Sequence, residues 1–326
     1  MTNVTFEAVG TVARRSPALD ALVPPDARIE RIAGGFEFTE GPVWINEGYL
    51  LFSDIPNNAI MKWTPDGGVS VLMKPSGYRG ERPFAGYEPG SNGLTLDPQG
   101  RLTIAEHGGR RVTRLESDGS LTVLAEYYQG KRLNSPNDLV YGPGGSLYFT
   151  DPTYGLESQK DDDPRKELPF NGVYRIDRAA HRPAGAPPAP ESLQLLIDDL
   201  TRPNGIVFSP DKRYLYVANS EPDKLFLRYE VYSDGAVTNR TVFFDVNSSP
   251  ETGCPDGMKV DQAGNLYATG PGGVWVFSPD GEHLGTLQPP EIPANCGWGD
   301  ADGRTLYMTA RTGVYRIRVN VPGVRP

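Results

Sequence analysis

The segment DGMKVDQAGNLYATG, residues 256–270, has the pattern of a β-hairpin. A polar residue and a glycine are followed by an apolar-x-apolar stretch, then by a turn rich in Asp, Ala and Gly. A second stretch follows that begins with Leu-Tyr and ends on small residues. Short apolar stretches on both sides of turn-forming residues predict two antiparallel strands.

The same pattern occurs six times along the chain, at intervals of 40 to 67 residues. The six segments open at Glu40, Asn92, Asn137, Asn204, Asp256 and Cys296. A propeller blade of four strands needs about 40–50 residues. We therefore expect an all-β fold, a six-bladed β-propeller. A stack or sandwich of hairpins is the alternative.

The expected propeller occupies residues 34–320 as one domain, with a lead-in at 1–33 and a tail at 321–326. The last repeat ends with GVYRIRV, residues 313–319, which leaves its blade one strand short. ARIERIA, residues 27–33, can supply that strand and close the ring as its outer strand.

Composition excludes several classes of protein. The 326 residues carry 32 basic and 41 acidic side chains, a net charge of −9, which argues against a nucleic-acid partner. No apolar run is long enough for a membrane helix, and MTNVTFEAVG lacks the features of a secretory signal. We expect a cytoplasmic protein with Cys254 and Cys296 reduced. The sequence indicates no oligomeric state.

The residues that open the repeats should surround the central channel, because equivalent positions of innermost strands are neighbours in a propeller. Five of the six carry carboxylate or amide oxygens. Burying such groups is costly unless a partner or a cation compensates them. Oxygen ligands favour calcium first and magnesium next. The alternative is structural, because Asn and Asp often bond to their own backbone.

Five motifs resemble a known family: TEGPVW (39–44), SPNDLVY (135–141), RPNGIVFSPD (202–211), LYVANS (215–220) and CPDGMKVDQAGNLYAT (254–269). Together they resemble the gluconolactonase, regucalcin (senescence marker protein) and luciferin-regenerating enzyme superfamily, across residues 34–320. EHGGRRVTR, residues 106–114, resembles the bacterial gluconolactonases. The resemblance implies a six-bladed propeller with one divalent cation in its channel.

Carried over by motif, the resemblance implies that Glu40, Asn204 and Asp256 bind the metal. Asn137 would bind metal or substrate. Calcium is the expected cation, with magnesium, zinc and manganese as alternatives. The sequence departs from the regucalcin branch at Ser135, where those members carry Arg.

The expected reaction is hydrolysis of a sugar lactone, glucono-1,5-lactone in the first instance. Calcium would polarise the carbonyl while water attacks. Asp256 is the base that the resemblance favours, and His107 is the rival because its ordinary pKa suits base work. A serine triad is not expected, since the chain has three histidines and no G-x-S-x-G motif.

Residues near the ends of the repeat strands are the predicted contacts to a sugar lactone: Asn92, Asn137, Arg132, Glu106, Asp151 and Tyr154. Trp298 is expected either to form a pocket wall or to pack within a blade. Phe84 and Tyr87 lie in a loop, residues 79–90, that is expected to cover the pocket. Two other functions stay open: hydrolysis of another ester or lactone, and a protein-binding platform with a structural metal.

Overall fold

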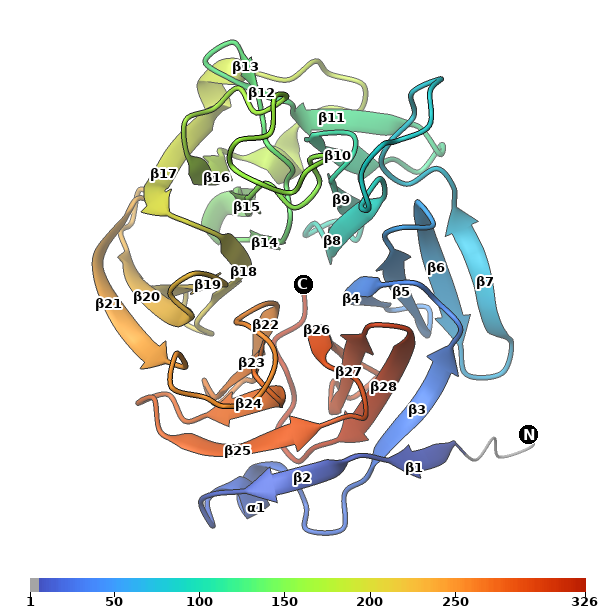
Figure 1. The fold of residues 1–326 in the computed structure, drawn as a ribbon, viewed down its shortest axis with the longest axis vertical. Coiled ribbons are helices and arrows are strands. Elements are labelled where there is room, and N and C mark those ends of the chain that lie inside the picture. Colours follow the sequence, from blue (N-terminus) through green and yellow to red (C-terminus); the bar gives the residue numbers. More distant parts are fainter. Residues whose placement is uncertain (1–5) are drawn as a thin grey trace.

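The computed structural model describes residues 6–326, which form six β-sheets arranged radially around a central channel (Figure 1). In every sheet neighbouring strands are antiparallel, and the first strand of each repeat is the innermost. The prediction of a six-bladed β-propeller is confirmed.

The first three blades follow one another along the chain. Blade one contains β4 (Thr39–Ile45), β5 (Tyr49–Asp54), β6 (Ala59–Thr64) and β7 (Gly68–Met73). Blade two contains β8 (Ser91–Leu96), β9 (Leu102–Glu106), β10 (Arg111–Leu115) and β11 (Leu121–Ala125). Blade three contains β14 (Leu139–Tyr141), β15 (Leu147–Asp151), β16 (Asn171–Ile176) and β17 (Leu193–Leu200).

The last three blades complete the ring. Blade four contains β18 (Pro203–Phe208), β19 (Tyr214–Asn219), β20 (Leu225–Val231) and β21 (Val237–Asp245). Blade five contains β22 (Met258–Val260), β23 (Leu266–Gly270), β24 (Gly273–Phe277) and β25 (His283–Gln288). Blade six contains β26 (Pro293–Gly299), β27 (Thr305–Ala310) and β28 (Gly313–Arg318).

The N-terminal segment supplies outer strands to two blades. β3 (Ile29–Gly34) pairs antiparallel with β28 and gives blade six its fourth strand, where the sequence placed residues 27–33. β1 (Glu7–Val9) pairs with β3, and β2 (Thr11–Arg14) pairs with β25 of blade five. The lead-in therefore joins blades five and six, which the sequence did not predict for residues 7–14.

The remaining elements are short. A two-stranded sheet of β12 (Tyr127–Tyr128) and β13 (Lys131–Arg132) precedes blade three. The helices are α1 (Leu19–Leu22), η1 (Pro143–Gly145), η2 (Ala179–His181) and η3 (Pro190–Ser192). None of the helices in residues 6–326 is long and apolar enough to cross a membrane.

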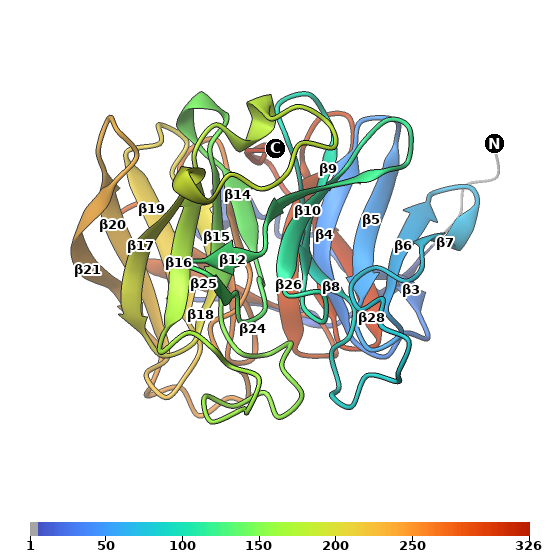
Figure 2. The same ribbon diagram turned by 90° about the horizontal axis from the view of Figure 1, so that it is seen from above.

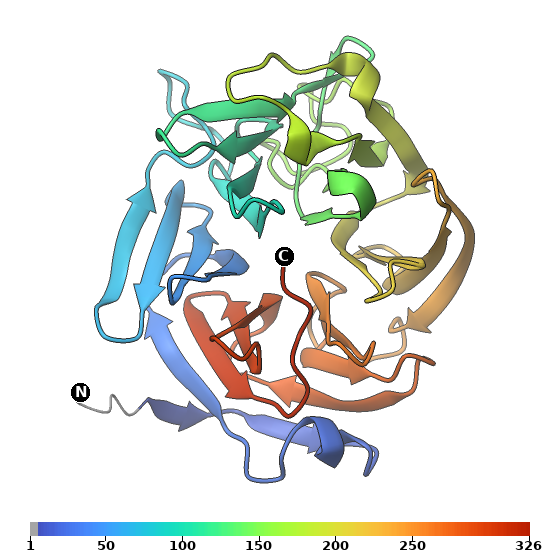
Figure 3. The ribbon, with the colours of Figure 1, turned by 180° about the vertical axis from the view of Figure 1, so that it is seen from behind.

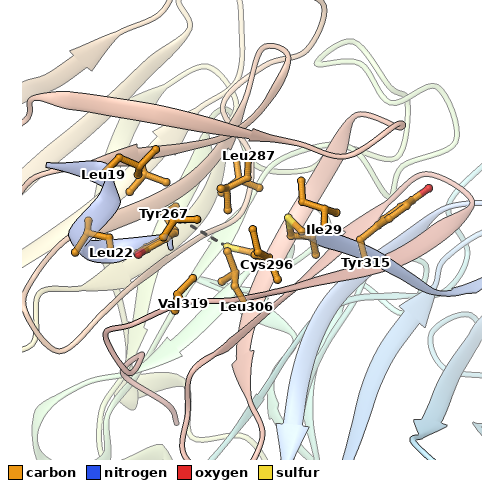
Figure 4. Packing of buried hydrophobic residues seen from close by; sticks show 14 of the residues in the cluster. Leu19, Leu22, Ile29, Tyr267, Leu287, Cys296, Leu306, Tyr315 and Val319 are labelled. Atoms are coloured by element: carbon orange, nitrogen blue, oxygen red, sulfur yellow. Dashed lines mark hydrogen bonds between the residues drawn. The ribbon is translucent and has the colours of Figure 1, made fainter. Parts of the chain in front are cut away.

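Each interface between blades buries an apolar cluster. Between blades five and six, Leu19 and Leu22 of α1 pack with Tyr267, Cys296 and other residues of the cluster (Figure 4). Cys296 is fully buried there, and its thiol lies 3.6 Å from the Tyr267 carbonyl oxygen. The prediction that Cys296 opens onto the channel is therefore wrong. Asn295 takes that position, because neighbouring residues of a strand point to opposite faces.

Four of the six innermost strands have an irregular register at their first residues. The shifts lie between Glu40 and Val43, between Ser91 and Leu94, between Pro203 and Ile206, and between Pro293 and Asn295. A β-bulge re-aims side chains and is common beside functional sites. The inner strands thus turn their first polar residues toward the channel while their later residues pack between blades.

The two faces of the propeller differ. Long loops, residues 74–90 and 152–170, extend from the face where the inner strands begin, and the C-terminus lies at the opposite face (Figure 2). The C-terminal tail, residues 320–326, runs to the centre of that opposite face (Figure 3). Its Val324 amide donates to the Val260 carbonyl at 3.0 Å.

Candidate active site

Six polar residues open the inner strands and form what we call the ring: Glu40, Asn92, Asn137, Asn204, Asp256 and Asn295. Backbone contacts link neighbouring members, since the Gly93 amide donates to the Asn137 carbonyl at 2.8 Å. A side chain on Gly205 would lie 2.2 Å from the Asp256 carbonyl oxygen, so glycine is required for this close approach.

The carboxylate side of the ring centres on Glu40. Its Oε2 accepts hydrogen bonds from the Gly41 amide at 2.6 Å and from Asn295 Nδ2 at 3.0 Å. Burial, followed by the negative charge of Asp138, raises the pKa of Glu40 to about 8. Burial also raises the pKa of Asp256 well above its usual range, and the charges of Glu40 and Asp138 add to this.

Asp138 and Lys259 join the ring, and the sequence analysis missed both. Asp138 Oδ2 is buried without a hydrogen-bond partner among the described residues, 4.0 Å from Lys259 Nζ. Lys259 Nζ also donates to the Met258 carbonyl at 3.0 Å. The sequence did contain a signal for Asp138: five of the six repeats carry Gly after the residue that opens them in the sequence pattern, and the third carries Asp138.

The amide side of the ring surrounds His107, which is fully buried. His107 Nε2 lies 3.2 Å from Asn92 Nδ2 and 3.3 Å from Asn137 Nδ2. His107 Nδ1 lies 2.8 Å from Glu88 Oε2. Glu88 comes from the loop at 79–90 and was also missed, because no repeat marks its position.

Asn204 is held by the residue that follows β19. Its Nδ2 donates to Ser220 Oγ at 3.1 Å, and Ser220 Oγ donates to the Pro255 carbonyl at 2.7 Å. Tyr154 lies in the same corner and is partly buried, and the Arg202 guanidinium is 5.5 Å from the centre of its ring. Burial raises the pKa of Tyr154, to which the charge of Asp256 contributes. Tyr154 is thus near the ring, as a substrate contact requires.

Two of the predicted substrate contacts, Glu106 and Arg132, form ion pairs away from the ring. Glu106 is fully buried and forms ion pairs with Arg79 at 2.7 Å and Arg111 at 2.8 Å. Arg132, in β13, pairs with Glu126 at 3.2 Å. The structure gives these residues contacts outside the ring.

Asp151 also has a structural role in the described residues. Its Oδ2 accepts a hydrogen bond from the Asn134 amide at 2.8 Å, and burial raises the pKa of Asp151 to about 7. These contacts fix the segment that leads into Asn137. Asp151 therefore supports the ring from behind and is not itself a ring member.

The loop expected to cover the pocket packs on its neighbour at this face. Phe84 contacts Tyr78 with ring centroids 5.2 Å apart, and the Arg165 guanidinium lies 5.3 Å from the Phe84 ring. Tyr87 is 53 % exposed and free to contact a ligand. Trp298 is a packing residue instead, since its indole donates to the Val260 carbonyl at 2.8 Å and packs on Tyr267.

The side chains of the ring fit a hard divalent cation. Three carboxyl groups lie here, those of Glu40, Asp138 and Asp256. Only one basic group, the Lys259 ammonium, lies beside them in the described residues. The side-chain nitrogens of Asn137 and Asn204 have protein partners, which leaves their oxygens for a ligand. Residues 6–326 contain no cluster of three or more His, Cys, Asp or Glu side chains that could bind a metal ion by itself. A cation at the ring therefore also needs the amide oxygens of Asn137 and Asn204. Such a donor set is typical of calcium or magnesium.

These features define a class of protein: a six-bladed propeller whose channel opens on a ring of buried oxygen ligands. Residues 38–312 match the family model described as the SMP-30/Gluconolactonase/LRE-like region. The chain belongs to this family.

Known relatives agree over nearly the whole chain. It is 40 % identical to a gluconolactonase of Zymomonas mobilis subsp. mobilis, over 98 % of this chain and 89 % of that protein. It is 29 % identical to a 6-deoxy-6-sulfogluconolactonase of Pseudomonas putida, over 87 % of this chain and 92 % of that protein. The solved structure of a gluconolactonase from Xanthomonas campestris superimposes with a TM-score of 0.79 at 32 % identity, over 98 % of this chain and 99 % of that chain.

Proposed function

We propose that this protein hydrolyses a sugar lactone, glucono-1,5-lactone first among the substrates, with a divalent cation held at the ring. That the chain is a lactone-hydrolysing enzyme follows from its family and from relatives named as lactonases. The cation and the particular lactone are the proposal. The observation that carries it is the set of carboxylates and amides gathered at one end of the channel, in which Asn92 Oδ1 and Asp138 Oδ2 are buried without a hydrogen-bond partner in the described residues.

Glu40, Asn137, Asn204 and Asp256 are the residues that would hold the cation. When bound, calcium supplies Lewis-acid polarisation of the lactone carbonyl and stabilises negative charge on its oxygen. The three carboxylates near the ring, with Lys259 beside Asp138, set a negative potential that favours a divalent ion.

Asp256 is the general base in this proposal. Water attacks the carbonyl carbon while the Asp256 carboxylate accepts its proton, and the bond from carbon to the ring oxygen then breaks. The proton passes to the leaving oxygen, which gives the open-chain hydroxy acid. Without a cation, burial and neighbouring carboxylates raise the pKa of Asp256. A bound cation would offset this rise, so the proposed role of Asp256 rests on its position at the ring.

His107 is less suited to that role. Its Nε2 faces two amide nitrogens, its Nδ1 faces Glu88, and no part of its side chain reaches solvent. Nε2 is therefore occupied by the protein and Nδ1 is buried against Glu88, so the geometry favours a positioning role.

The test is hydrolysis by protein stripped with chelator and then given calcium, magnesium, zinc or manganese one at a time. Glucono-1,5-lactone and an aryl ester are assayed side by side, each with a blank for spontaneous hydrolysis. We expect activity to return with calcium and to favour the sugar lactone. Activity unaffected by chelation, or faster on the aryl ester, would contradict the proposal. No hydrolysis under any condition would favour the binding platform.

A further inference from the structure

The contact between Glu88 and His107 determines where the proton of the imidazole lies. Glu88 Oε2 is 2.8 Å from His107 Nδ1, and Glu88 is 8 % exposed. The contact is a close approach without hydrogen-bond geometry in the described residues. Two lone pairs at that distance would repel, so Nδ1 is the nitrogen to which we assign the proton. In a neutral imidazole Nε2 is then an acceptor.

An acceptor at Nε2 determines how two ring amides are oriented. Asn92 and Asn137 both place their side-chain groups within 3.3 Å of this single atom. Only an amide N–H can donate to it, so both Nδ2 atoms must face His107. Both Oδ1 atoms then face away from the imidazole.

The Asn92 side chain provides an independent observation. It is 4 % exposed, and its Oδ1 has no hydrogen-bond partner among the described residues. A buried carbonyl oxygen is rarely left unpaired, so at the ring this atom is available to a ligand.

Glu88 is itself fixed by the neighbouring loop. Gln159 Nε2 donates to Glu88 Oε1 at 3.1 Å and to the Tyr154 carbonyl at 3.0 Å. The Gly155 backbone packs directly on His107, since a side chain there would lie 2.4 Å from His107 Cβ. The two loops over this face therefore hold the Glu88–His107 pair from both sides.

We propose that Glu88 and His107 are positioning residues that turn the amide oxygens of Asn92 and Asn137 toward the ring. Asn92 thereby becomes a further oxygen donor to the cation, beside the four residues named above. This inference rests on the proposed function for the identity of the ligand. The inference goes beyond the proposed function because it assigns roles to Glu88, His107 and Asn92.

The tautomer is measured first, by nitrogen NMR of protein with labelled histidine, without cation. The chain has three histidines, so His107→Gln assigns the signal directly. We expect neutral His107 with Nδ1 protonated and Nε2 bare. Protonation of Nε2 would overturn the inference, because the Asn92 and Asn137 amides would then have the opposite orientation.

Calcium titration calorimetry is the second measurement. Glu88→Gln should raise the calcium Kd about tenfold or more, as is usual for residues that orient metal ligands. Glu88→Asp keeps the charge but shortens the side chain, so an equal rise would assign the effect to the contact with Nδ1. Glu81→Gln, an exposed glutamate of the same loop, is the control and should leave Kd within about twofold.

An unchanged Kd in both Glu88 variants would overturn the positioning role. Failure of the wild-type protein to bind calcium would contradict the cation of the proposed function. The tautomer measurement needs no cation, so it decides the orientation of the amides in that case as well.

Discussion

The two ends of the central channel are built from the same six inner strands and have opposite chemistry. At the ring, the strands begin with carboxylates and amides, and the negative charges of the carboxylates repel one another. At the other end, the strands continue with Trp44, Leu96, Phe208 and similar residues around a cavity of about 280 Å³. The C-terminal tail borders that cavity through Val324, Arg325 and Pro326.

This difference separates stability from function within single strands. Apolar burial stabilises the fold by about 25 cal/mol for each Å² removed from water, whereas buried like charges destabilise it. A protein retains destabilising groups where they bind or react. We therefore expect substitutions at the ring to affect activity and substitutions at the apolar end to affect folding.

The largest expected effect is that of Asp256→Asn. Loss of the general base should lower the hydrolysis rate about 10²–10⁴-fold. The variant without cation should unfold at a higher temperature than wild type, because one of the mutually repelling carboxylates is removed. Steady-state kinetics and thermal melting test both effects.

Asp151→Asn is the control, since Asp151 is a fully buried carboxylate that lies behind the ring, whereas Asp256 is partly buried. It should retain most of the activity. If it were inactive while folded, and Asp256→Asn were active, the assignment of the ring as the reactive end would be wrong.

Trp298→Ala should have the converse effect. Removing this buried indole, which packs on Tyr267 and donates to Val260, should lower the free energy of unfolding by about 3–5 kcal/mol. The calcium Kd and the KM of the folded protein should stay within about twofold. A large change in either constant, with stability unchanged, would break the distinction between the two ends.

A smaller effect is the pH dependence of stability without cation. Folding raises the pKa of Glu40 from its ordinary value of 4.5 to about 8. The folded protein therefore binds this proton more tightly than the unfolded protein does. Stability from this group is complete below pH 4.5 and is lost as pH rises toward 8. The loss amounts to a few kcal/mol, since one pKa unit corresponds to about 1.4 kcal/mol.

Melting curves between pH 5 and 8 test this with Glu40→Gln as the reference, which should have a flatter profile. Calcium must displace the proton, so the stabilisation by calcium should grow over the same range. Identical profiles for wild type and Glu40→Gln would contradict the electrostatic description of the ring.

The sequence was sufficient for the fold because each blade repeats a local pattern of hairpin and turn. It also located five of the six ring residues, since Glu40, Asn92, Asn137, Asn204 and Asp256 follow the repeat. It misplaced the sixth by one residue, at Cys296 in place of Asn295, because the register shift in β26 is not visible in the pattern.

The contacts that surround the ring were beyond sequence reasoning. Glu88 reaches His107 from a long loop, and Lys259 approaches Asp138 from two blades away. Such pairs depend on how distant segments pack, which no local pattern encodes. Conversely, Glu106 and Arg132 occur near strand ends, yet nearby charges draw them into ion pairs outside the ring.

The most direct test of the ring is a crystal structure of the protein soaked with calcium, with anomalous scattering used to locate the ion. We predict one calcium per chain, bound by the oxygens of Glu40, Asn137, Asn204 and Asp256 at about 2.3–2.6 Å, with the Asn92 oxygen as a further ligand. A calcium-dependent enzyme with no ion at the ring, or with its ion at another position, would contradict the account.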